Sequence, residues 1–186
     1  MALFFDEAVR RPLDACVPHW IKPNHLSLGR VALIVPLLYW WDRPIIAVSA
    51  VIVAGALDLF DGPLARIRGQ VSRLGAFIDA IADKAFVWSA LLFACRGIFP
   101  SWLVWSVVVA DLALIAIRPI KLAMKRSVNA TALSKVKFWL QMIALCLALT
   151  RSGWLDAPAA GTLGTALFCA VMSLLTHVHD LGRTPS

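Results

Sequence analysis

The stretch Asp58–Lys84, which reads DLFDGPLARIRGQVSRLGAFIDAIADK, contains four aspartates in two closely spaced pairs. Asp58 and Asp61 are three residues apart, and Asp79 and Asp83 are four residues apart. On an α-helix these spacings place both carboxylates of a pair on the same face. The stretch therefore predicts two helices, each with a pair of carboxylates on one side.

Apolar sequence surrounds this stretch, over residues 45–57 and 85–94, so the carboxylates belong to hydrophobic helices. One Asp at the centre of a membrane-inserted helix costs about 2.5–3.5 kcal/mol, and four of them need compensation. Carboxylate oxygens on two facing helices can hold Mg²⁺ or Mn²⁺ and leave coordination positions open for a phosphate-bearing substrate. The alternative is four aspartates at helix ends, each capped by Arg or water.

The composition is that of a membrane protein. Of the 186 residues, 60% are hydrophobic and only 16% are charged. Several membrane spans of about 20 residues each use most of this length, which leaves little room for a separate soluble domain. The chain is therefore expected to form one compact helical unit. The net charge of +7 is distributed as expected for contact with lipid headgroups and phosphates, and we expect no nucleic-acid partner.

Proline, glycine and charged residues divide the chain into apolar runs. Residues 1–22 predict a short amphipathic helix on the membrane surface. Pro119 is expected to bend the fourth span, because it removes a backbone hydrogen bond. The fold class is thus an all-α integral membrane protein with a six-helix catalytic domain at 23–180 and a tail at 181–186. The six spans are predicted at about residues 26–41, 45–68, 75–95, 102–124, 137–150 and 157–178.

The distribution of Lys and Arg predicts the orientation in the membrane. With these six spans, fourteen basic residues fall on one side and three, Arg43, Arg96 and Arg151, on the other, while Lys84 lies inside the aspartate stretch. Positive charge concentrates in short cytoplasmic loops. We therefore expect a multi-pass protein of the cell (inner) membrane, with both termini and the aspartates at the cytoplasmic face.

Small and basic residues accompany the aspartates. Gly62 and Ala65 open space beside the helix backbone, and Gly75 serves either substrate clearance or close helix packing. Arg66 and Arg73 place guanidinium groups near the carboxylates. A metal site with Arg beside it suggests a diphosphate ligand. For Arg73, ordinary loop charge explains the residue equally well.

The spacing of these residues resembles the signature of the CDP-alcohol phosphotransferase (phosphatidyltransferase) family. Its eight fixed residues span 26 positions and all are present: Asp58, Asp61, Gly62, Ala65, Arg66, Gly75, Asp79 and Asp83. The segment PNHLS at 23–27 also looks like the entry to the family's first span, and six spans is the family's architecture.

The resemblance implies a reaction and roles for these residues. Asp58, Asp61 and Asp79 would hold two divalent ions, Mg²⁺ or Mn²⁺, and Asp83 would contribute to the second ion and act as general base. An acceptor hydroxyl would attack the lipid-side phosphorus of CDP-diacylglycerol, and CMP would leave. The family also suggests a homodimer. Residues implied at the CDP portion of the donor are Asp58, Gly62, Ala65, Arg66 and Gly75.

Two segments resemble the phosphatidylglycerophosphate synthases within the family. One is FIDAIADKA at 77–85, and the other is SKVK at 134–137, followed by Gln141. In two positions the chain departs from those enzymes: Ala80 replaces a Pro, and Pro119 replaces a Glu. The resemblance implies glycerol 3-phosphate as the acceptor and phosphatidylglycerophosphate as the product of this step in phospholipid biosynthesis.

Cations predicted near the cytoplasmic mouth suit such a doubly charged acceptor. They are Arg73, Arg118, Lys135 and Lys137. For Lys135 and Lys137 the alternative is anchoring at the membrane interface by long side chains. Asp111, inside the fourth span, needs a partner, and helix packing and function are equally good explanations.

Other functions stay open at this point. A sister transferase could use phosphatidylglycerol, serine or inositol phosphate as acceptor. A small cation transporter could use the aspartates as an ion path, but it should carry acidic residues onward through the membrane, and the third and fifth predicted spans have none towards the opposite face.

Overall fold

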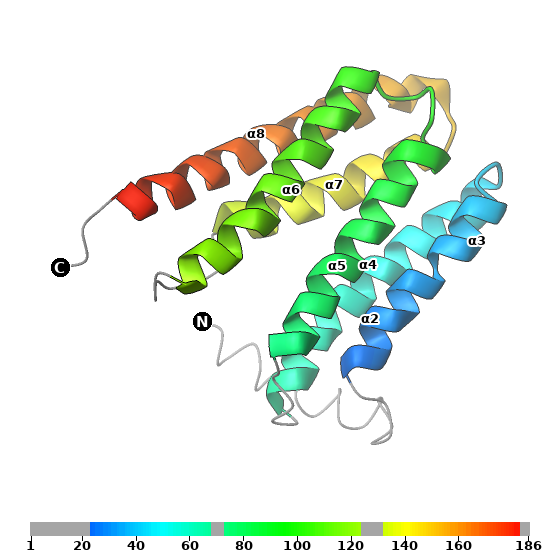
Figure 1. Ribbon diagram of the computed structural model, residues 1–186. Coiled ribbons are helices and arrows are strands. Elements are labelled where there is room, and N and C mark those ends of the chain that lie inside the picture. The colour runs from blue at the N-terminus through cyan, green and yellow to red at the C-terminus, as the bar shows by residue number, and fades with distance from the viewer. Residues whose placement is uncertain (1–22, 68–72, 124–131, 183–186) are drawn as a thin grey trace. The chain divides into compact units, whose positions relative to one another are not determined.

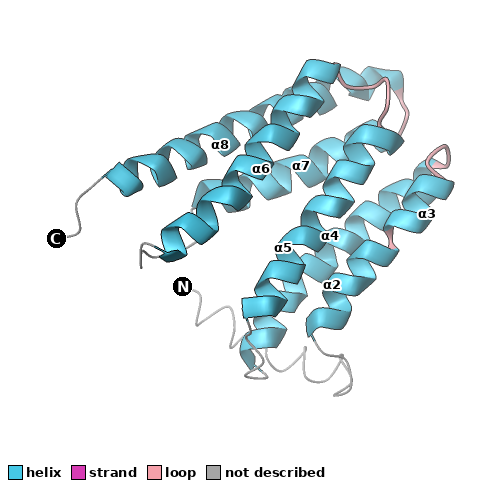
Figure 2. Cartoon of the chain, viewed as in Figure 1, coloured by secondary structure: helices cyan, strands magenta, loops and turns pink. Residues whose placement is uncertain are grey.

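The computed structural model describes residues 23–67, 73–123 and 132–182, and every regular element in this part of the chain is a helix, with turns and loops between them (Figures 1 and 2). The all-α prediction is therefore confirmed. The chain divides into two compact units, Met1–Ala90 and Leu91–Ser186. The predicted surface helix at 1–22 lies outside the described residues.

The first unit contains four described helices. Helix α2 packs against both α4 and α5, and α3 packs against α4. Pro44 begins α4, a position where its missing N–H costs no helical hydrogen bond. Buried apolar side chains such as Val51 and Phe86 form the core. The helices are α2 (Pro23–Ala32), α3 (Ile34–Tyr39), α4 (Pro44–Ile67) and α5 (Arg73–Ser89).

The first predicted span is two helices rather than one. Helix α2 ends at Ala32, and α3 begins at Ile34 after a single turn residue, Leu33. Pro36 explains the interruption, because its ring has no N–H to donate and clashes with the carbonyl four residues earlier, at Ala32. Helical hydrogen bonding resumes after the interruption, since the Leu37 N–H donates to the Leu33 carbonyl oxygen over 3.2 Å.

The second unit packs α8 against both α6 and α7. Alanines and other small residues are buried on α7 and α8, including Ala144, Ala148, Ala166 and Ala170, and they allow close approach of the two helices. Gly97, with φ of 85°, makes the turn before α6. The elements are the π-helical turn η1 (Ala90–Ala94), α6 (Ser101–Ala123), α7 (Ala132–Leu149), the short 3-10 helix η2 (Gly153–Leu155) and α8 (Asp156–Gly182).

The predicted limits of the last two spans differ from those observed by several residues, at the beginning of α7 and at the end of α8. Helix α7 begins at Ala132, five residues before the predicted start at Lys137. Polar and charged residues at the start of α7 hid this first turn from a search for apolar sequence, yet Ala and Leu favour helix there. Helix α8 continues to Gly182, beyond the predicted end at 178. Helix α6 runs through Pro119.

Large apolar side chains face outward on several helices. Ile45 is 83% exposed, Trp102 68% and Phe168 61%. Soluble proteins rarely expose so many bulky apolar groups together. Among the described helices, the segment Gly153–Leu181 is long and apolar enough to cross a membrane, and shorter apolar helices cover His25–Tyr39, Pro44–Phe60 and Ser101–Ile117.

Candidate functional site

The aspartate stretch forms two helices, as its spacing predicts. Asp58 and Asp61 lie in α4, three residues apart, and Asp79 and Asp83 lie in α5, four residues apart. Gly62, Ala65 and Arg66 follow in the last two turns of α4, whereas Arg73 and Gly75 stand at the beginning of α5. Of these nine residues, the structure describes the side chains of Asp58 and Asp83.

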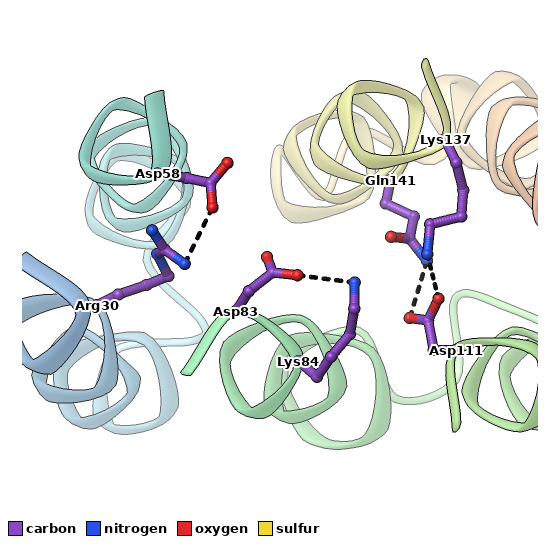
Figure 3. A network of polar contacts seen from close by, with 7 residues as sticks. All are labelled: Arg30, Asp58, Asp83, Lys84, Asp111, Lys137 and Gln141. Carbon is purple, nitrogen blue, oxygen red and sulfur yellow. Dashed lines mark hydrogen bonds and ion pairs between the residues drawn. The ribbon is translucent and has the colours of Figure 1, made fainter. Parts of the chain in front are cut away.

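Asp58 forms an ion pair with Arg30 of helix α2. The distance from Arg30 Nη1 to Asp58 Oδ1 is 3.1 Å, with the Arg30 side chain fully buried and that of Asp58 29% exposed (Figure 3). The contact exists because α2 packs on α4. Buried charges are tolerated when they are paired, so Arg30 compensates part of the cost of Asp58.

The two carboxylate oxygens of Asp83 differ: Oδ2 forms an ion pair, and Oδ1 has no hydrogen-bond partner among the described residues. Its Oδ2 lies 2.7 Å from Lys84 Nζ, and both side chains are nearly buried, at 13% and 12% exposure. Its Oδ1 is buried and has no hydrogen-bond partner among the described residues. In Figure 3 the carboxylates of Asp58 and Asp83 extend from α4 and α5 toward a common region. The Lys84 ammonium thus orients a carboxylate whose other oxygen can accept a proton or bind a cation.

The donor set fits a hard divalent cation. Asp58 and Asp83 supply carboxylate oxygens, and the unpartnered buried Oδ1 of Asp83 is the kind of atom that a metal ion satisfies. Among the described residues, no three His, Cys, Asp or Glu side chains gather as a metal site. The other two predicted ligands, Asp61 and Asp79, have side chains outside the description.

A second polar cluster lies within the unit Leu91–Ser186. Lys137 of α7 donates a hydrogen bond to Oδ1 of Asp111 on α6 and forms an ion pair with it (Figure 3). The Gln141 side-chain amide donates to Asp111 Oδ2 over 3.3 Å. All three side chains are buried. The partner that Asp111 requires is therefore Lys137, and Lys137 is not an exposed interfacial anchor.

For Lys135 and Arg118, two other residues predicted to bind the acceptor, the structure gives no side-chain contact within its described part. Lys135 is exposed near the beginning of α7. Arg118 lies in α6, and its side chain is outside the description. The nearby Lys121 is buried and donates to His177 Nδ1 over 2.8 Å and to Asp180 Oδ2 over 3.1 Å, which fastens α6 to α8. Lys121 is thus committed to a structural contact.

Two residues with polar roles were not predicted from the sequence. Arg30 is one of the fourteen basic residues counted on the cytoplasmic side and enters the sequence analysis only as a positive charge, although a cation inside an apolar span itself signals a buried partner. Gln141 was noticed only as part of a resemblance. A rule that asks for a partner for every polar residue within a span would have selected both.

Comparison with known protein families identifies the family of this chain. The sequence profile of CDP-alcohol phosphatidyltransferases matches residues 20–177, which is most of the chain. The chain belongs to the CDP-alcohol phosphatidyltransferase family. It is therefore a transferase, and the helices that carry the aspartates, α4 and α5, lie within the matched region.

Several curated members of this family are similar to the chain. A CDP-diacylglycerol–glycerol-3-phosphate 3-phosphatidyltransferase of Blochmanniella floridana is 29% identical over 171 residues, which cover 86% of this chain and 90% of the relative. The protein of the same name from Escherichia coli K12 is 30% identical over 168 residues, covering 84% and 92%. That of Bacillus subtilis is 29% identical over 148 residues, covering 70% and 77%.

Proposed function

We propose that this phosphatidyltransferase moves the phosphatidyl group of CDP-diacylglycerol to glycerol 3-phosphate and releases CMP. Three similar family members carry names that state this donor and this acceptor. The chain has the family's complete aspartate pattern, on two helices. These names favour glycerol 3-phosphate over phosphatidylglycerol, serine or inositol phosphate, and family membership disfavours a cation transporter.

The observation that carries the mechanism is the arrangement around Asp83. Lys84 holds Oδ2, and Oδ1 is buried without a partner among the described residues. We assign Oδ1 as the atom that takes the proton of the acceptor hydroxyl, since a general base must have an available lone pair within reach of that proton. The hydroxyl oxygen then forms a bond to the lipid-side phosphorus, and the bond from that phosphorus to the CMP oxygen breaks.

The four aspartates are proposed as ligands of two divalent ions, Mg²⁺ or Mn²⁺, which when bound neutralise charge on the diphosphate. Asp58, Asp61 and Asp79 would hold them, and Asp83 would contribute to the second. Arg30 orients Asp58 for this role through the 3.1 Å ion pair. Phosphoryl transfer depends mainly on positioning and on neutralising charge, so a rigid set of carboxylates contributes directly to catalysis.

The remaining site residues are proposed from the motif and from charge. Gly62, Ala65, Arg66 and Gly75 would border the CDP portion together with Asp58. Arg73, Arg118 and the exposed Lys135 would attract the acceptor phosphate, and Lys137 would contact the acceptor from inside its pair with Asp111.

We further propose the membrane arrangement that the sequence predicts. The described helices provide six apolar segments, of which α2 and α3 together make the first. In this arrangement all six cross the membrane, and both termini and the aspartates face the cytoplasm, because the basic residues concentrate on that side. A homodimer, suggested by the family resemblance, stays a prediction.

The test is CMP release by the purified protein in detergent with CDP-diacylglycerol and Mg²⁺ or Mn²⁺, across a panel of acceptors. Release that depends on glycerol 3-phosphate, with phosphatidylglycerophosphate as product, supports the proposal. Release with another alcohol instead would reassign the acceptor. No release with any acceptor would contradict the proposed activity.

A further inference from the structure

Two of the aspartates proposed as metal ligands each have one oxygen held by a cation. Arg30 Nη1 lies 3.1 Å from Asp58 Oδ1, and Lys84 Nζ lies 2.7 Å from Asp83 Oδ2 (Figure 3). The other oxygen of Asp83, Oδ1, is buried and has no hydrogen-bond partner among the described residues. Asp58 makes further contacts, so Oδ2 is the most that it has left. Each aspartate can therefore offer at most one oxygen to a metal ion.

The two ion pairs are placed where they do not open easily. The Arg30 side chain is fully buried, and that of Lys84 is 12% exposed. Helix α2, which carries Arg30, packs against both α4 and α5. A cation that gave up its carboxylate oxygen would stay in this poorly hydrated position with less compensation for its charge. Both pairs are therefore expected to persist when a metal ion binds.

A persistent pair limits how a metal ion can use the carboxylate. An ion that bound both oxygens of Asp83 would contact the oxygen that already accepts from the Lys84 ammonium. The two positive charges would then lie on the same atom, and their repulsion is strong where little water screens it. The same argument applies to Asp58 and the guanidinium of Arg30. Binding through a single oxygen keeps the metal ion and the side-chain cation on different atoms.

Divalent ions differ in how well they accept this limit. Ca²⁺ takes about six to eight oxygen ligands and often binds both oxygens of one carboxylate. Mg²⁺ takes an octahedral set of ligands, keeps several water molecules and needs only one or two carboxylates beside substrate phosphates. Mn²⁺ also accepts octahedral oxygen ligands. Carboxylates that offer one oxygen each suit Mg²⁺ and Mn²⁺ and leave Ca²⁺ short of ligands.

We infer that Arg30 and Lys84 set the metal preference of the site. By restricting Asp58 and Asp83 to one oxygen each, they favour Mg²⁺ or Mn²⁺ over Ca²⁺. This inference rests on the proposed function, which places divalent ions on the aspartates. Arg30 and Lys84 act as positioning residues, because they contact the carboxylates and work through them.

The experiment measures metal binding by the purified protein in detergent, without substrate. The electron paramagnetic resonance signal of free Mn²⁺ gives the Kd for Mn²⁺, and displacement of Mn²⁺ by Ca²⁺ gives the Kd for Ca²⁺. The proteins are the wild type, Arg30→Met and Lys84→Met, which keep an unbranched side chain without its charge. Arg43→Met is the control, because it removes a positive charge from an exposed position in the turn before α4. Thermal unfolding checks that each variant is folded.

The wild type and Arg43→Met should bind Mn²⁺ more tightly than Ca²⁺. In Arg30→Met and Lys84→Met the ratio of the Kd for Ca²⁺ to the Kd for Mn²⁺ should fall by about tenfold or more, the size of effect typical for partners of metal ligands. A role that is only electrostatic or structural changes both Kd values by the same factor, because the two ions have equal charge. The ratio of the two Kd values is therefore the decisive quantity.

Two results would overturn the inference. One is a ratio within about twofold of the wild type in the folded Arg30→Met and Lys84→Met variants. The other is a wild type that binds Ca²⁺ at least as tightly as Mn²⁺, and this result decides the matter even if the variants do not fold.

The same preparation separates this inference from the proposed function. A wild type that binds no Mn²⁺ refutes the proposed metal site and the inference together. A wild type that binds Mn²⁺ and releases CMP with glycerol 3-phosphate, but has no preference over Ca²⁺, refutes the inference alone. CMP release with another alcohol reassigns the acceptor, whereas the measured metal preference still supports the inference.

Discussion

Replacing Arg30 by Met removes the guanidinium that pairs with Asp58 while keeping the length and packing of the side chain. The Arg30 side chain is fully buried, and that of Asp58 is 29% exposed. Breaking a buried pair by removing one partner costs about 3–5 kcal/mol, and the partial exposure of Asp58 puts this case near the lower value, about 3 kcal/mol. At about 2–4 °C per kcal/mol for a protein of this size, the expected fall in Tm is about 6–12 °C.

The measurement is thermal unfolding in detergent, followed with a dye that reacts with thiols. Cys95 and Cys169 are buried, so they become reactive only as the protein unfolds. Arg43→Met serves as the matched control because Arg43 is exposed in the turn before α4, and its Tm should change by less than about 2 °C.

The double variant Arg30→Met with Asp58→Asn sharpens the test. Removing both charges leaves no carboxylate that has lost its cation, so the double variant should be more stable than the sum of the two single changes predicts. A coupling free energy of about 1–3 kcal/mol is expected. A Tm for Arg30→Met within 2 °C of the wild type, or strictly additive effects, would refute the argument that this pair stabilises the aspartate helix.

Two further predictions concern the reaction. Removing divalent ions with EDTA should abolish CMP release, and adding Mg²⁺ or Mn²⁺ should restore it, since the proposed ligands are all carboxylates. Full activity in EDTA would show that the aspartates serve another purpose. Arg118→Ala should raise the KM for glycerol 3-phosphate by about tenfold, the value of one charge-assisted contact, and leave the KM for CDP-diacylglycerol within about twofold. An equal rise in both KM values would exclude a specific role for Arg118 at the acceptor phosphate.

Much of the fold follows from the pattern of apolar runs and helix breakers. The helix breakers between the predicted spans include Pro44, which begins α4, and Gly97, which makes the turn before α6, and each has a backbone requirement that is local. The break at Leu33 was missed, although Pro36 explains it. The first turn of α7 was also missed, because its residues between Ala132 and Lys137 include polar ones.

The site was predictable to the extent that it depends on spacing along one helix. Asp58 with Asp61, and Asp79 with Asp83, fall on helices at the intervals that the sequence states. Contacts between helices were not predictable in the same way. The pairing of Arg30 with Asp58, and of Lys137 with Asp111, joins residues 28 and 26 positions apart, and only packing of the helices selects these partners.

The most direct test of the central claim compares glycerol 3-phosphate-dependent CMP release by the wild type and by Asp83→Asn, with Asp42→Asn as an exposed control from the same unit. The proposed role of Asp83 Oδ1 predicts that Asp83→Asn keeps a Tm within a few degrees of the wild type. Its kcat should fall by about 10²- to 10⁴-fold. Asp42→Asn should keep full activity. Turnover by folded Asp83→Asn within tenfold of the wild type would contradict its assignment as the general base.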